Sequence, residues 1–158
     1  MKITLAAIGK FRNSEPEQAL ALDYLKRAEV SGRPLGINGV KLQEYEIKAK
    51  DNVKVRESNL LRENINNDCF LIVLDERGQN ISSRQLAGMF EKQMQNGTKE
   101  IIFAIGGADG HDEDMRKKGD FLLSFSKLTW PHKLCRIMAS EQIYRAVSIM
   151  ANSPYHRD

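Results

Sequence analysis

The sequence has no long apolar run and no secretory signal. Nothing in its 158 residues approaches the roughly 20 consecutive apolar residues that a membrane-spanning helix needs. The opening segment Met1–Leu5 has neither the apolar stretch nor the cleavage site of a signal peptide. We therefore expect a cytoplasmic protein that has no membrane partner.

Cysteine is scarce, and the common nucleotide-binding fingerprints are absent. Cys69 and Cys135 each lie in an apolar run, so they predict neither a disulfide framework nor a metal cluster. The three histidines show no zinc spacing, and we expect no metal. Neither G-x-x-x-x-G-K-[ST] nor G-x-G-x-x-G occurs, which disfavours P-loop and dinucleotide-binding enzymes.

Positive charge is small overall but unevenly distributed. The net charge is +3. The segment Arg116–Arg145 holds seven basic and two acidic residues, a local +5 that leaves −2 for the rest of the chain. Such a segment suits a surface that faces phosphate, although a solvated basic face explains it equally well. Within this segment, the residues expected to contact phosphate are Lys127, Lys133 and Arg136. Lys10 and Arg12, near the N-terminus, are added to them.

Short apolar runs alternate with helical patterns along the whole chain. The expected strands are Ile3–Ile8, Leu42–Ile47, Cys69–Leu74, Ile101–Ile105 and Phe121–Phe125. Five helices are expected. The first is capped by Ser14 and has Pro16 in its first turn, and the second begins at about Asn52. The third is capped by Ser82 or Ser83 and ended by Gly97, the fourth is short and charged, and the last covers about Leu134–Ala151. This alternation predicts a single α/β domain, residues 1–158, with a mainly parallel sheet flanked by helices.

Three segments leave strands at the carboxyl edge of this sheet, where ligands bind in open α/β folds. They are Leu74–Gly78, with a turn at Asp75–Gly78, then Gly106–Gly110 and Phe125–Pro131. The glycine-rich turn is either structural or a close approach to a ligand. Trp130 is either a core anchor or part of an apolar wall for an adenine.

The last helix is apolar on nearly every side, which predicts burial on more than one face and a second subunit covering one of them. Glu141 and Arg145 either form an ion pair within this helix or orient a substrate. His132 is either a residue of the helix cap or a site residue. We expect His111 to be solvated and His156 to lie in a disordered tail.

Several motifs, taken in order, resemble the RlmH (YbeA-like) group of SPOUT methyltransferases over essentially the full chain. The motifs are Ile72–Asp75 with Gly78, Ile105–Gly107 with Gly110, Leu123–Thr129, Pro131-His132, Glu141–Ala146 and Pro154–Arg157. The opening Met1–Leu5 and Gly9-Lys10 also agree. The segments Glu76-Arg77, Ala108-Asp109 and Lys133–Cys135 differ from the group without removing a recurring motif residue.

The resemblance implies a homodimeric SPOUT fold with a C-terminal deep trefoil knot. It also implies methyl transfer from S-adenosylmethionine to N3 of a pseudouridine in a stem-loop of 23S rRNA, on assembled ribosomes. The cofactor-binding residues it implies are Leu74, Gly106, Phe125, Ser126, Lys127, Leu128, Thr129 and Trp130. The implied residues of RNA binding and the active site are Glu141, Tyr144, Arg145, Tyr155, His156 and Arg157.

The chemistry requires removal of a weakly acidic imide proton beside an activated methyl group. His156 or His132 can accept this proton, and Arg145 or Arg157 can stabilise the anion, while Glu141 can position Arg145. We hypothesise that His156 and Arg157 of one subunit complete a site built on the cofactor loops of the other. The rival hypothesis is a non-catalytic factor that binds RNA or ribosomes through the same basic face.

Overall fold

A five-stranded sheet, parallel throughout, forms the centre of the molecule. The computed structural model describes residues 1–12, 15–48 and 50–157. Within these ranges the strands are β1 (Lys2–Ile8), β2 (Val40–Tyr45), β3 (Phe70–Gln79), β4 (Glu100–Ile105) and β5 (Phe121–Leu123). Their order across the sheet is β2-β1-β4-β3-β5. The predicted parallel α/β architecture is confirmed.

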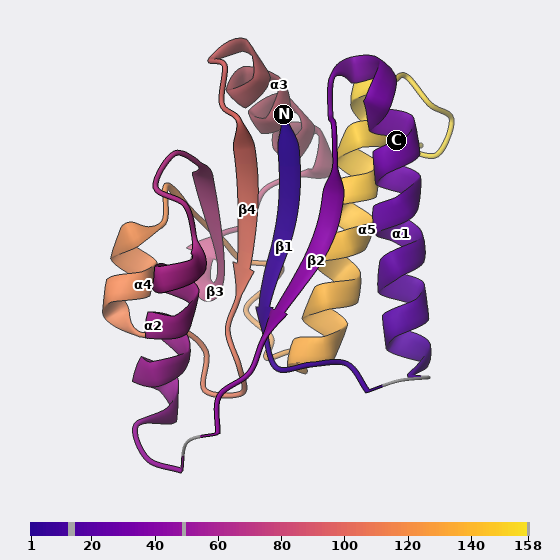
Figure 1. Cartoon of the computed structure of the whole chain (residues 1–158). Coiled ribbons are helices and arrows are strands. Elements are labelled where there is room, and N and C mark those ends of the chain that lie inside the picture. The colour runs from indigo at the N-terminus through magenta and orange to yellow at the C-terminus, as the bar shows by residue number, and fades with distance from the viewer. Residues whose placement is uncertain (13–14, 49, 158) are drawn as a thin grey trace.

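Helices cover both faces of the sheet (Figure 1). They are α1 (Pro16–Gly32), α2 (Val53–Asn64), α3 (Ser83–Gln95), α4 (Glu113–Lys118) and α5 (His132–Met150), and a 3-10 turn, η1 (Arg33–Leu35), follows α1. Side chains of α1, α3 and α5 share one core with inward residues such as Leu5 and Phe103. Leu61 of α2 and Met115 of α4 share the opposite core with Ala6 and Val73.

Local sequence signals set several of these boundaries. Ser82 caps α3 in a capping box, in which its hydroxyl accepts from the Gln85 N–H and the Gln85 side chain accepts from the Ser82 N–H. Gly97 follows α3 with a φ of +73°, a conformation that glycine adopts without strain. The first helix begins at Pro16, and Ser14, its expected cap, lies outside the described residues.

The predicted turn at Asp75–Gly78 is wrong, because β3 continues to Gln79. The β3–β5 pairing shifts register between Leu74 and Gln79, so the chain bulges and then pairs again with Leu123. A Cβ on Gly78 would lie 2.6 Å from the Leu123 carbonyl carbon, so only glycine allows this approach. Turn-forming residues here mark an irregularity inside a strand.

The last helix packs on α1, on α3 and on the sheet within its own chain. Much of its apolar surface is therefore buried within one chain, although Leu134 stays 42% exposed and Ile137 and Met138 are only partly buried. The expectation that Arg136 contacts RNA phosphates is wrong, because the side chain is fully buried. Its guanidinium donates to Glu44 at 3.0 Å and to the Ile8 carbonyl, and it lies 4.9 Å from the centre of the Phe11 ring.

Over the described part of the chain, no helix has the length and apolar character that crossing a bilayer requires.

Candidate active site

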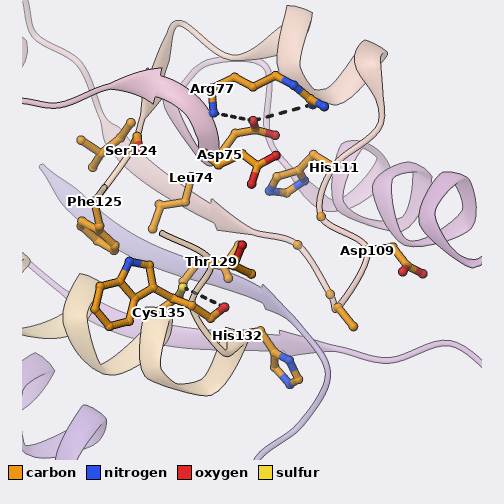
Figure 2. A pocket seen from close by; sticks show the side chains of 18 of the residues that line it. Leu74, Asp75, Arg77, Asp109, His111, Ser124, Phe125, Thr129, His132 and Cys135 are labelled. Atoms are coloured by element: carbon orange, nitrogen blue, oxygen red, sulfur yellow. Dashed lines mark hydrogen bonds and ion pairs between the residues drawn. The ribbon is translucent and has the colours of Figure 1, made fainter. Parts of the chain in front are cut away.

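A pocket of about 300 Å³ opens at the carboxyl ends of β3, β4 and β5 (Figure 2). The chain leaves β4 toward α4 on one face and leaves β3 toward α3 on the other, and such a divergence opens a crevice between neighbouring strands. The predicted residues that line this pocket are Leu74, Gly106, Phe125, Ser126, Leu128, Thr129, Trp130 and His132. Seven of the eight cofactor-binding residues implied by the resemblance are thus brought together.

The glycine-rich loop after β4 forms one wall of the pocket. A Cβ on Gly106 would lie 2.9 Å from the carbonyl carbon of Gly110, so the loop closes on itself too tightly for a side chain. A Cβ on Gly107 would lie 2.9 Å from the Glu57 Cδ atom of α2. The contact at Gly106 is with backbone and requires glycine, whereas the Glu57 carboxyl near Gly107 ends a flexible side chain that can shift.

The segment after β5 forms a second, largely apolar wall. The Ser126 hydroxyl oxygen accepts from the Leu128 N–H at 3.0 Å and from the Trp130 indole N–H at 2.9 Å. Ser124 donates to the Ser126 carbonyl at 2.8 Å. Trp130 keeps 37% of its surface exposed, so it is a wall of the pocket and not a core anchor.

His132 is the first residue of α5 and lies at the edge of the pocket, a position that suits either of its two possible roles. Burial, reinforced by the positive charges of Arg136 and Lys133, lowers the pKa of its imidazole. The ring is therefore neutral near pH 7 and able to accept a proton. Burial also raises the pKa of the neighbouring Cys135 thiol, which argues against a thiolate nucleophile.

A charged cluster centred on Asp75, a motif residue to which the sequence assigned no role, lies on the far side of the pocket. The Asp75 carboxylate lies 3.6 Å from Arg116. It also lies 4.0 Å from Arg77 (Figure 2). Arg116 also donates to the carbonyl of His111. The prediction that His111 is solvated is wrong, because only 1% of it is exposed and its Nε2 lies 3.3 Å from the Ala104 carbonyl.

A second group gathers around the far half of α5. The Glu141 carboxylate accepts from Arg145 Nε at 2.9 Å and from the Tyr155 hydroxyl at 3.0 Å. Arg145 also lies 3.4 Å from His156 Nδ1. Burial and the bond to Glu141 together raise the pKa of Tyr155. The structure shows the Glu141–Arg145 ion pair, one of the two roles that the sequence left open. The tail, which was expected to be disordered, folds back onto the helix.

One chain does not bring these two groups together. Nine positions separate His132 from Glu141, which corresponds to about 14 Å along a helix. Arg157 is exposed beyond His156. Lys127, the remaining predicted cofactor residue, lines an adjoining cavity of about 720 Å³ between α1, α3 and α5, together with Glu141; the two cavities share the residues 123–126.

Comparisons with known proteins agree with this geometry. A family model described as "Predicted SPOUT methyltransferase" matches residues 1–156. Proteins named ribosomal RNA large subunit methyltransferase H from Maricaulis maris and Paracoccus denitrificans are 40% and 42% identical, each over 158 residues and the full length of both chains. One from Cereibacter sphaeroides is 43% identical over 157 residues, 99% of each chain.

Among solved structures, a probable methyltransferase from Bordetella pertussis superposes with a TM-score of 0.54 at 10% identity, covering 92% of this chain and 95% of that one. At this identity the likeness shows only that the two share a fold. The matches in sequence extend over nearly the entire chain and confirm the resemblance seen in its motifs. The chain belongs to the SPOUT methyltransferase family.

Proposed function

We propose that this protein transfers a methyl group from S-adenosylmethionine to the ribosomal RNA of the large subunit. The observation that carries the proposal is the pocket at the carboxyl ends of β3, β4 and β5, in a chain whose full-length relatives are named as methyltransferases of that RNA. The finer assignment is N3 of a pseudouridine in a 23S rRNA stem-loop, on assembled ribosomes in the cytoplasm. It is supported by the shared motifs alone.

The pocket fits the cofactor in size and in chemistry. Its volume of about 300 Å³ lies at the lower end of the range for small-molecule sites. Leu74, Leu128 and Trp130 offer an apolar wall to an adenine, and the loop at Gly106 offers backbone groups at close approach. Once bound, S-adenosylmethionine would supply a methyl group already activated by its sulfonium. We propose that no metal takes part.

In the proposed reaction His132 accepts the imide proton. Of the two candidate bases it is the one that lines the pocket, and its lowered pKa keeps it neutral. Arg145 would stabilise the anion that forms at the imide, because a nearby cation favours the deprotonated form. Glu141 holds Arg145 from one side, which restricts where its guanidinium points.

The active site would be completed by a second copy of the chain. His132 and the Glu141–Arg145–His156 group lie apart in one chain, so a homodimer is the simplest arrangement that joins them. The cavity that Glu141 shares with Leu20, Tyr24 and Met138 offers a partly apolar surface for this contact. In this arrangement Arg157 of one subunit would reach the cofactor loops of the other, together with His156.

We also propose the deep trefoil knot of this family, within one domain that spans residues 1–158. After β5 the chain passes from the α4 face of the sheet to the α5 face. At this crossing the Ser124 N–H donates to the Gln79 carbonyl at 3.0 Å, and the Asn80 side chain donates to the Ser124 carbonyl at 2.7 Å. These bonds hold the crossing segment against the end of β3, as a threaded chain requires.

Methyl transfer from labelled S-adenosylmethionine, first to ribosomes and then to free rRNA, tests the proposal when the modified nucleotide is mapped. We expect transfer to ribosomes, because one small chain offers too little surface to recognise unstructured RNA. Calorimetry with S-adenosylmethionine separates this function from a non-catalytic RNA- or ribosome-binding factor. That rival predicts no cofactor binding and no transfer.

Removal of the last four residues, from Tyr155 onward, tests the composite site. The truncated chain should bind S-adenosylmethionine as the full chain does, because the tail lies outside the pocket. It should lose methyl transfer, because His156 and Arg157 are absent. Full activity in the truncated protein would rule out a role for the tail.

A further inference from the structure

Two loops lie side by side where β1 and β2 end, at the carboxyl edge that also bears the pocket (lower edge in Figure 1). The Gly9 N–H donates to the Tyr45 carbonyl at 2.6 Å, and the Phe11 N–H donates to Glu44 at 2.8 Å. These loops and the start of α2 carry five cations, here called the edge cations: Lys10, Arg12, Lys48, Lys50 and Lys54.

The acidic side chains at this edge are largely neutralised from elsewhere. The pairs are Glu15 with Lys133 at 2.6 Å, Glu44 with Arg136 at 3.0 Å, and Asp51 with Arg56 at 3.4 Å. Two exposed acids remain near this edge, Glu46 and, in the loop after β4, Asp109, which lines the pocket. Among residues 1–12, 15–48 and 50–157, none of the edge cations forms a salt bridge. Internal pairing therefore leaves the outward charge positive.

The edge cations border the pocket. Lys54 lines it directly. On the other side, a Cβ on Gly9 would lie 4.0 Å from Nε2 of His132, and Lys10 is the next residue. An anionic chain that crosses this edge would therefore pass beside the proposed base.

We propose that the edge cations bind the phosphate backbone of the RNA that carries the target nucleotide. This inference rests on the proposed function and names the surface that it uses. Exposed lysines without acidic partners suit this role, because phosphates can displace their counterions without breaking an ion pair. Arg136 and Lys133, expected from the sequence to contact phosphate, would act indirectly by neutralising Glu44 and Glu15.

A matched pair of triple variants tests the proposal. In the first, the exposed edge lysines Lys10, Lys48 and Lys50 are each changed to Gln. In the control, the exposed lysines Lys2, Lys41 and Lys99, which lie at or near the opposite edge of the sheet, are changed in the same way. Both variants lose three positive charges. Affinity for ribosomes is then measured as a function of salt, together with KM and kcat for methyl transfer.

We expect the edge variant to raise the KM for ribosomes at least tenfold while kcat stays unchanged, because the edge lysines do not touch the reacting atoms. Three lost contacts should lower the salt slope by about 2, so the fall in affinity between 50 and 200 mM salt shrinks by roughly 20-fold. The control variant should behave as the wild type.

Equal losses in the two variants would overturn the proposal, because they would indicate a general effect of net charge. An unchanged KM and salt slope in the edge variant would overturn it as well. Calorimetry with S-adenosylmethionine is run on both variants, so that failure of the edge surface is distinguished from failure of the methyltransferase function. Suppose that neither the wild type nor either variant transfers methyl groups, and that the edge variant alone loses ribosome binding. The edge cations would then still bind RNA, and the proposed methyltransferase function would be refuted.

Discussion

Gly106→Ala should weaken the binding of S-adenosylmethionine while the protein still folds. The added Cβ would lie 2.9 Å from the Gly110 carbonyl carbon and 3.0 Å from its oxygen, whereas ordinary contacts begin near 3.4 Å. The obstructing atoms are backbone, so the loop or the end of β4 must move by about 0.5 Å. Overpacking of this kind costs about 1–3 kcal/mol of unfolding free energy.

The same displacement moves one wall of the pocket. A misplacement of 1 Å at a reacting centre can cost about 100-fold, so a shift of half that size should weaken S-adenosylmethionine binding by about tenfold. Calorimetry near 25 °C gives the affinity, and urea unfolding gives the stability and shows that the variant is folded during the titration.

Gly88→Ala provides the matched control. Gly88 lies within α3, and beyond the backbone of its own helix no heavy atom lies within 4 Å of the place that a Cβ would take. Alanine should therefore stabilise the helix by about 0.5–1 kcal/mol and leave binding unchanged. A folded Gly106→Ala protein that binds S-adenosylmethionine with wild-type affinity would refute the assignment of this loop to the cofactor site.

Two further predictions concern buried charge. Burial lowers the pKa of His111, so the unfolded chain takes up a proton below about pH 6.5 that the folded chain resists, and stability falls as the pH decreases. The melting temperature of His111→Leu should therefore fall less than that of the wild type when the pH is lowered from about 7.5 to about 5.5. An equal fall in the two proteins would contradict this. Arg136→Met leaves Glu44 unpaired and should cost about 3–5 kcal/mol in urea unfolding. Adding Glu44→Gln should restore part of that loss, and a purely additive double variant would argue against the ion pair.

Much of the fold follows from local patterns in the sequence. Ser82 and Gln85 contain the whole capping box of α3 within four residues, and the run Ile101–Ile105 is a buried strand by composition alone. The pocket was predictable too, because the carboxyl ends of parallel strands meet at one edge.

What escaped prediction depends on partners distant in sequence. Arg136 carries the same charge whether it faces RNA or the core, and its burial is decided by Glu44, 92 residues away. His111 is surrounded in sequence by acidic and polar residues, yet its position is set by packing against the end of β4. The separation of Glu141 from His132, by contrast, already followed from their nine-residue spacing at and along one predicted helix.

The buried guanidinium of Arg136 also bears on how the chain reaches this structure. It donates to the Ile8 carbonyl, which is 128 positions earlier in the sequence, so α5 is bonded to the end of β1. Contacts between residues so far apart raise the contact order, and a high contact order slows folding. During synthesis the apolar face of β1 and β4 is not fully covered until α5, the last of the described helices, has been made. A nascent chain would thus expose the part of this face that α5 covers until that helix has been made, a period in which chaperones would be of most use.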